Sequence, residues 1–191
     1  MTKKEIRKKY TEKRKTLSQD EVLLLSERIF NNIFQFFTFS ENQKVHCFLP
    51  ISHKKEFDTQ RFIDELLIRN IRVFVPKIVD EKLISVEINA KTNFIKNHWG
   101  IPEPQSDEDY GKKDFDFVIT PLLYCDNQGN RVGYGKGFYD SLFENMSSNA
   151  RKIGVNFFNP EEIVDDVWEG DIALDYLVTP TAVLSFGEGK S

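Results

Sequence analysis

Segments that read as β-strands alternate with a helical segment in the first half of the chain, and this order constrains the fold more than any other feature. Residues 44–50 (KVHCFLP) and 71–79 (IRVFVPKIV) are short apolar runs of the kind found in buried strands. Residues 56–70 between them predict a short helix that begins near Asp58 or Thr59. Because strands joined through a helix lie parallel in one sheet, this order predicts a parallel unit.

The alternation continues along the chain and indicates an α/β fold. Ser18 and Glu21 form a capping box ahead of a core-packing helix, whose apolar stripe lies at positions 22, 25, 29, 33 and 36–37. The later segments predict strands at 82–89, 115–125 and 151–158, a polar loop at 98–113, a loop turning into a helix at 134–146 and a terminal strand pair at 175–186. We expect a single three-layer domain, residues 1–191, with a mostly parallel open sheet flanked by helices.

The charge is divided unevenly along the chain. Residues 1–15 carry eight Lys or Arg and two Glu, a net +6, so the remainder carries −10 of the total of −4. An acidic remainder argues against general nucleic-acid binding. Residues 2–16 predict a basic helix on which Lys3, Arg7 and Arg14 share one face. Such a face is usually solvated, although it could also meet one anionic ligand.

Targeting and cysteine patterns favour a reduced, cytoplasmic protein that we expect to be a monomer. No apolar run approaches the roughly 18 residues of a membrane span, and the N-terminus is charged where a signal peptide is apolar. Cys47 and Cys125 lie in apolar runs, where buried thiols are expected. The three histidines show no spacing typical of a zinc site or a catalytic base, so we expect packing or surface roles for His46, His53 and His98.

Residues 129–140, GNRVGYGKGFYD, combine four glycines with two cations, a composition that suits phosphate binding. The loop does not match a Walker motif, because Asn130 stands where that motif begins with Gly. It does not match the dinucleotide motif either, because Phe138 occupies the third Gly position. The residues that would still present N–H donors and a charge to a polyphosphate are Gly133, Gly135, Gly137 and Lys136.

Asp140 follows this loop about one turn into the predicted helix, and two interpretations stay open. Its carboxylate suits the positive end of a helix dipole. It could also ligate Mg²⁺, since this ion takes one or two carboxylates together with phosphate oxygens and water.

Five segments in this order and spacing resemble the 5-formyltetrahydrofolate cyclo-ligase (methenyltetrahydrofolate synthetase) family over nearly the whole chain. The segments are Lys3-x-x-x-Arg7, EFDT at 56–59, WGIPEP at 99–104, TPLLYCDNQGNRVGYGKGFYD at 120–140 and EGDIALDYLVTP at 169–180. The glycine loop is the most specific of them. The chain departs from the family pattern at Gly170, where many relatives carry His, and at Ser141, where Arg often follows the loop.

The resemblance implies conversion of 5-formyltetrahydrofolate to 5,10-methenyltetrahydrofolate. The reaction would consume ATP, require Mg²⁺ and release ADP and phosphate. ATP would phosphorylate the formyl oxygen, and the neighbouring N10 amine would close the ring and displace phosphate. Because no protein nucleophile is needed, the protein would position the substrates and stabilise charge.

Matching motif positions imply the site residues. ATP would be bound by Lys3, Arg7, Arg131, Gly133, Gly135, Lys136, Gly137 and Tyr139, and the catalytic pair among these would be Lys136 and Arg131. Mg²⁺ would be held by Asp140 and Asp171. Folate would meet Ile51, Glu56, Trp99 and Tyr139, with Glu56 accepting N–H donors of the pterin and the two aromatic residues stacking, while Phe138 stays in the core.

Two other function classes stay open on the residues alone. One is a different phosphate-handling α/β enzyme, such as a sugar-phosphate isomerase, which would not need ATP. The other is a nucleotide- or folate-binding regulator without turnover. Lys136, Asp140 and Asp171 are all present, which argues against loss of catalysis.

Overall fold

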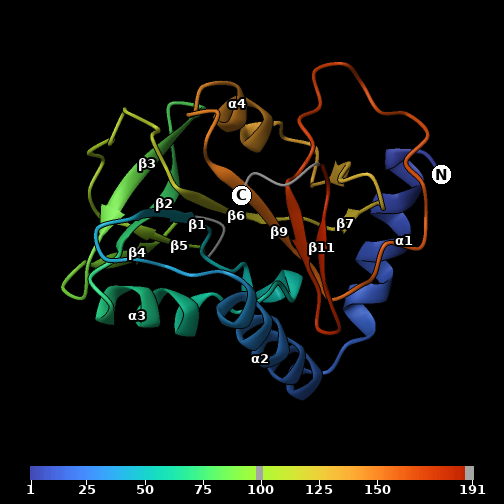
Figure 1. Ribbon diagram of the computed structural model, residues 1–191, viewed down its shortest axis with the longest axis horizontal. Coiled ribbons are helices and arrows are strands. Elements are labelled where there is room, and N and C mark those ends of the chain that lie inside the picture. The colour runs from blue at the N-terminus through green and yellow to red at the C-terminus, as the bar shows by residue number, and fades with distance from the viewer. Residues whose placement is uncertain (98–100, 188–191) are drawn as a thin grey trace.

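The computed structural model describes residues 1–97 and 101–187, and a seven-stranded sheet forms its middle layer (Figure 1). The sheet strands are β1 (Lys44–Cys47), β2 (Arg72–Val79), β3 (Lys82–Ile88), β6 (Phe117–Pro121), β9 (Arg151–Val155), β10 (Tyr176–Val178) and β11 (Val183–Ser185). Their order is β11-β10-β9-β6-β1-β2-β3. The inner strands run parallel, and the edge strands β3 and β11 are antiparallel to their neighbours.

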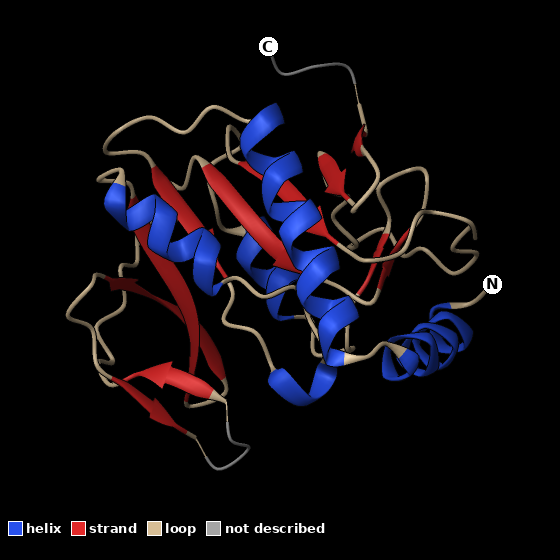
Figure 2. Cartoon of the chain, turned by 90° about the horizontal axis from the view of Figure 1, so that it is seen from below, coloured by secondary structure: helices blue, strands red, loops and turns tan. Residues whose placement is uncertain are grey.

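Helices cover both faces of this sheet, which confirms the predicted three-layer architecture. The helices are α1 (Lys3–Thr16), α2 (Gln19–Phe36), the 3₁₀ turn η1 (Ser52–Lys54), α3 (Gln60–Ile68) and α4 (Phe138–Glu144). Helices α2 and α3 lie across one face (Figure 2), where Ile29, Ile33 and Phe62 join the larger hydrophobic core. Helix α4 covers the opposite face with Leu142 and Phe143. Burial of both sheet faces explains why the inner strands read as continuous apolar runs.

Helix α1 lies on neither face and packs beside a hairpin at one side of the molecule (Figure 1). The hairpin consists of β7 (Tyr124–Cys125) and β8 (Arg131–Val132). The sequence predicted one strand at 115–125, and the structure divides it between β6 in the main sheet and β7 in the hairpin. Tyr124 and Cys125 pair with β8 because the Asp126 carboxylate accepts the N–H groups of Gln128 and Asn130, each at 2.9 Å, and so closes the tight turn between β7 and β8.

The prediction of a continuous polar loop at 98–113 was wrong in one part. Strand β5 (Pro102–Pro104) pairs with β4 (Phe94–Lys96) in a small antiparallel ladder outside the main sheet. Prolines are tolerated there because a two-stranded ladder leaves one side of each strand without a hydrogen-bonding neighbour.

Within the described residues, no helix combines the length and apolar character that crossing a lipid bilayer requires. Both cysteines are buried free thiols, as predicted.

Candidate functional site

Segments that follow three neighbouring parallel strands meet at one edge of the sheet. Strand β1 leads into residues 48–56, β6 into the hairpin and the glycine loop 133–137, and β9 into residues 156–171. Carboxyl ends of neighbouring parallel strands share one edge, which is where open α/β sheets bind ligands. Apart from α1, the predicted site residues that the structure describes belong to these segments or to the start of α4.

An apolar stripe fixes α1 at this edge. Ile6 and Tyr10 are fully buried, and the Tyr10 ring stacks on Tyr124 with ring centroids 4.3 Å apart. Residues three and four apart share a helix face, so the same face carries three cations into the structure. They are Lys3, Arg7 and Arg14. This face is therefore not the solvated surface that basic helices usually present.

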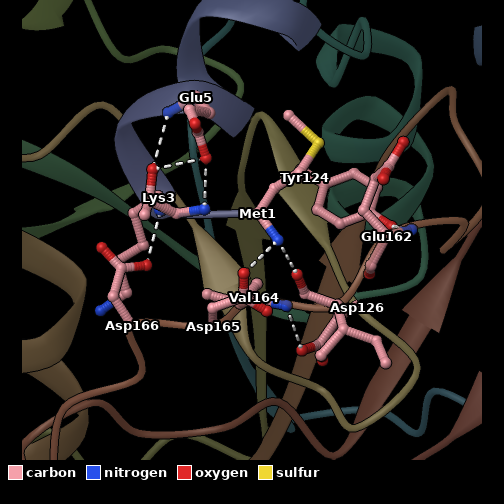
Figure 3. Close-up of polar contacts among 11 residues, drawn as sticks. Met1, Lys3, Glu5, Tyr124, Asp126, Glu162, Val164, Asp165 and Asp166 are labelled. Atoms are coloured by element: carbon pink, nitrogen blue, oxygen red, sulfur yellow. Dashed lines mark hydrogen bonds and ion pairs between the residues drawn. The ribbon is translucent and has the colours of Figure 1, made fainter.

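The first turn of α1 is bound to the segment 161–166, as Figure 3 shows. The Lys3 N–H donates to the Asp166 carboxylate at 2.6 Å, and the Asp165 N–H donates to the Met1 carbonyl at 3.1 Å. Thr2 and Glu5 complete the turn with a capping box. These contacts bring the Lys3 side chain to the Asp171 carboxylate, with which its ammonium group forms an ion pair.

The glycine loop lies beside the second turn of α1. Arg7 Nε donates to the Gly133 carbonyl at 2.9 Å, and its guanidinium lies against Gly135. Gly135 and Gly137 have φ values of +90° and +71°, which L side chains rarely adopt. None of the backbone N–H groups of residues 134–140 donates to a residue that the structure describes. The loop thus presents unpaired donors next to a cation, as anion binding requires.

Lys136 is exposed at the tip of this loop, and its ammonium group contacts no charged partner among the described residues. Its charge is therefore available to a ligand.

Arg131 connects the loop to the two predicted metal ligands. It is nearly buried, donating to Asp140 Oδ1 at 2.6 Å and to the Ile172 carbonyl at 3.0 Å. Burial alone would raise the pKa of Asp171. The hydrogen bond from Lys3, the backbone N–H of Trp168 and the charges of Lys3 and Arg131 together lower that pKa below its usual value. Both carboxylates are therefore held in a strongly cationic setting.

The donor set fits magnesium that arrives with a nucleotide. Asp140 Oδ2 and Asp171 Oδ1 accept no hydrogen bond from a described residue, so one oxygen of each carboxylate is open. No cluster of three or more His, Cys, Asp or Glu suited to a metal occurs in the described part of the chain. Magnesium needs only one or two carboxylates where phosphate oxygens and water complete its shell.

Glu56 lies in a recess on the other side of the loop. It is 6% exposed, and its carboxylate accepts the Ile51 N–H at 2.7 Å and the Tyr134 hydroxyl at 2.9 Å. Burial raises the pKa of Glu56, and these two donors, with the charges of Arg14 and Lys54, oppose that shift only in part. The recess is lined by Arg14, Phe48, Glu56, Phe57, Pro121, Leu122, Val155, Asn156 and Phe157.

Two residues near Glu56, Arg14 in the recess and Tyr134 in the glycine loop, were not assigned to the folate side of the site from the sequence. Arg14 is 4% exposed and donates to the Leu122 carbonyl at 2.7 Å, to Asn156 Oδ1 at 3.2 Å and to the Tyr134 hydroxyl at 3.3 Å. Its spacing from Lys3 and Arg7 was the available signal. Tyr134 was expected to contact ATP together with the rest of the loop, and its hydroxyl donates to Glu56 instead.

Tyr139 turns its hydroxyl into the protein, where that oxygen is buried and has no partner among the described residues. Burial raises its pKa well above the usual value. The ring lies edge-on to His46, with centroids 6.3 Å apart. His46 is fully buried and burial lowers its pKa to about 3, so it packs as a neutral ring, as expected. Trp99 lies outside the described residues.

The chain is similar to proteins of one known family over most of its length. The model of the 5-formyltetrahydrofolate cyclo-ligase family matches residues 1–180. The 5-formyltetrahydrofolate cyclo-ligase of Mycoplasma pneumoniae is 27% identical over 180 residues, which cover 93% of this chain and 98% of that protein. The protein of the same name from Escherichia coli K12 is 30% identical over 140 residues, covering 70% of this chain and 76% of that protein.

A solved structure shares the whole fold. The NMR structure of Aquifex aeolicus 5,10-methenyltetrahydrofolate synthetase superposes with a TM-score of 0.83 at 31% identity, covering 100% of this chain and 96% of that one. The family match spans most of the chain and includes all five sequence segments described above. The chain belongs to the 5-formyltetrahydrofolate cyclo-ligase family.

Proposed function

We propose that this cyclo-ligase activates 5-formyltetrahydrofolate by transferring the γ-phosphoryl group of ATP to the formyl oxygen. The formamide carbon resists attack because the nitrogen lone pair is delocalised into the carbonyl. Phosphorylation breaks the bond between the γ-phosphorus and its bridging oxygen, which releases ADP and makes the formyl oxygen a leaving group. The N10 amine then attacks the formyl carbon, and loss of inorganic phosphate and the N10 proton gives the methenyl product.

The ATP phosphates would lie between α1 and the glycine loop. Lys3 and Arg7 supply cations from the helix, and the unpaired N–H groups of residues 134–140 supply donors. Lys136 and Arg131 would stabilise charge on the transferring phosphoryl group, each through charge-assisted hydrogen bonds. The positive φ values of Gly135 and Gly137 support close approach of the backbone to these phosphates.

Asp140 and Asp171 would hold Mg²⁺ through their open oxygens. Bound there with the nucleotide, the ion would neutralise phosphate charge during transfer. Ion pairs with Lys3 and Arg131 orient Asp171 and Asp140, respectively.

Glu56 would anchor the pterin ring. Each carboxylate oxygen has two acceptor positions, and Ile51 and Tyr134 occupy only one on each, which leaves capacity for N–H donors of an aminopyrimidine. Tyr139 and Trp99 are the aromatic residues assigned to ring stacking. For Tyr139 the edge-on contact with His46 supports a ring held in place at the start of α4.

The observation that carries this proposal is the contact between Tyr134 and Glu56. Tyr134 belongs to the glycine loop, and its hydroxyl is 2.9 Å from the Glu56 carboxylate. One side chain therefore separates the proposed phosphate loop from the proposed pterin anchor. Direct phosphoryl transfer between two bound substrates needs this proximity.

The test follows the near-ultraviolet absorbance of the conjugated methenyl product. Purified protein, 5-formyltetrahydrofolate, ATP and Mg²⁺ together should give a rise in absorbance, and omission of any one should abolish it. A rise without ATP would favour a different chemistry, and ATP binding without a rise would favour the regulator.

We infer further that the enzyme acts as a cytoplasmic monomer on these small molecules. All groups assigned to the site come from one chain, so no partner copy is needed to complete it. Sedimentation equilibrium of the active enzyme at assay concentration should give the mass of one chain, 22.3 kDa.

A further inference from the structure

Trp168 is a large aromatic side chain left in solvent. It is 71% exposed, although indoles are usually well buried in folded proteins. The turn that carries it is well fixed, because the Asp171 N–H donates to the Trp168 carbonyl at 2.9 Å and the Trp168 N–H donates to Asp171 Oδ2 at 2.6 Å. A rigid backbone therefore presents an exposed ring.

Gly170 makes room for this ring. A Cβ atom on Gly170 would lie 1.9 Å from an indole carbon of Trp168, a distance at which the ring would have to move. The backbone of Gly170 does not adopt a positive φ, so the turn itself does not require glycine. The absence of a side chain at position 170 thus serves the placement of the indole against the turn.

The backbone that carries the ring adjoins the groups assigned above to the ATP phosphates. Asp171 Oδ2 accepts both the backbone N–H of Trp168 and the Lys3 ammonium group, so these two donors meet at one oxygen atom. Arg7 follows Lys3 by one helical turn and donates to the Gly133 carbonyl of the glycine loop. An exposed aromatic side chain next to two cations and unpaired loop amides suits the base and the phosphates of one nucleotide.

We propose that the Trp168 indole, exposed on a turn that also contacts the Lys3–Asp171 pair through its backbone, is the platform on which the adenine base of ATP stacks. This inference rests on the proposed function, in which the phosphates lie along Lys3, Arg7 and the glycine loop. Stacking on an indole does not read the hydrogen-bonding edge of a base, so it tolerates different purines. The site should therefore bind ATP and GTP with similar affinity and bind inorganic tripolyphosphate distinctly more weakly.

The test compares Trp168→Ala, Trp168→Phe and Val167→Ala by isothermal titration with ATP and with tripolyphosphate. Trp168→Ala should raise the Kd for ATP about tenfold and leave the Kd for tripolyphosphate within about twofold. Trp168→Phe should recover most of the lost affinity, because it keeps an aromatic face. Val167 is exposed next to Trp168 and carries no assigned role, so Val167→Ala is the matched control and should bind ATP as the native chain does.

Gly170→Ala provides a second variant that keeps the tryptophan and moves its ring. It should weaken ATP binding in the same direction as Trp168→Ala, again without a matching effect on tripolyphosphate. The KM for ATP should rise in both variants, while the KM for 5-formyltetrahydrofolate should stay at the native value.

Three outcomes would overturn the proposal. Unchanged ATP affinity in Trp168→Ala would show that the base does not rest on the indole. Equal losses for ATP and tripolyphosphate would assign the effect to the Lys3–Asp171 pair. A change of oligomeric state in Trp168→Ala with native ATP affinity would make the ring a docking surface. If the native chain still forms the methenyl product with ATP, each of these outcomes overturns the stacking proposal and leaves the proposed function intact. If the native chain shows no ATP-dependent turnover, the proposed function itself is refuted.

Discussion

Substitution of Lys136 tests a chemical role of the glycine loop with little effect on its structure. It is exposed and forms no ion pair with a described residue, so Lys136→Ala should not change the melting temperature. Turnover should fall at least about tenfold, because the role we propose for this charge is to stabilise the transferring phosphoryl group. Lys91, an exposed lysine in a turn remote in sequence from the loop, gives a matched control. Native turnover in Lys136→Ala would remove the residue from the catalytic set.

Glu56→Gln tests the division of the site into two halves. A glutamine keeps an acceptor for Ile51 or Tyr134, and it loses the charge that anchors N–H donors of the pterin. The Kd for 5-formyltetrahydrofolate should rise about tenfold or more, and the Kd for ATP should change by less than about twofold. Equal changes in both titrations would contradict the assignment.

The raised pKa of Glu56 predicts that the stability of the native chain depends on pH. Burial raises the pKa of Glu56 above its unfolded value, so the native state binds its proton more tightly than the unfolded state. Ionisation of Glu56 therefore costs stability as the pH rises from about 4, the unfolded value, through the raised pKa. Urea unfolding of the native chain and Glu56→Gln across this range should show the native chain losing stability relative to the variant. A constant difference at all pH values would show that the raised pKa is wrong.

The sequence predicted site residues from their charge or from the backbone conformation that they permit. Lys3, Arg7 and Glu56 were implied by short motifs, and their roles stay predictions. The structure places Lys3 beside Asp171 and Arg7 beside the glycine loop. Arg14 was not assigned and Tyr134 was counted only with the loop residues around ATP, because their contact belongs to a buried network between segments more than a hundred residues apart. Burial of that kind depends on tertiary packing and leaves no local pattern.

At the scale of elements, the order of helices and strands followed from periodicity, and the exceptions have local causes. The apolar stripe of α2 was expected to include Phe36, which is 53% exposed. Ser26, which lies outside the predicted stripe, is buried on that helix and accepts the Asp58 N–H at 3.1 Å, a polar contact to the segment that leads into α3. Hydrogen bonds between elements are invisible to periodicity.

Arg14 should matter for the attachment of α1 as a whole. Arg14→Ala leaves the Leu122 carbonyl and the Asn156 side chain without their buried donor, which should cost about 2–4 kcal/mol in the free energy of unfolding. Binding of 5-formyltetrahydrofolate should weaken too, because Tyr134 loses a partner beside Glu56. Chemical denaturation measures the first effect, with Lys8→Ala on the exposed side of α1 as control. A loss no larger than that of the control would mean that the other contacts of α1 suffice to hold it without Arg14.

At the scale of the whole molecule, the site is assembled from the beginning, middle and end of the chain. Lys3 meets Asp171, and Arg7 meets Gly133, across more than a hundred residues of sequence in each case. Helix α1 does not pack on either face of the sheet. Its position depends on contacts with the hairpin and with segment 161–166 (Figure 3). A nucleotide bound between α1 and the loop would therefore add contacts between two segments that lie far apart in the sequence.

This arrangement predicts where ATP protects the backbone from hydrogen exchange. The N–H groups of residues 134–140 have no acceptor among the described residues, so they should exchange quickly in the free enzyme. Bound phosphates supply acceptors and should slow exchange there and in the first turns of α1. Strand β3, at the far edge of the sheet, should keep its native exchange because none of its residues is assigned to the nucleotide site. Exchange followed by mass spectrometry with saturating ATP measures all three regions at once. If ATP binds while residues 134–140 still exchange at the free rate, the phosphates lie elsewhere, and α1 and the loop form a structural contact only.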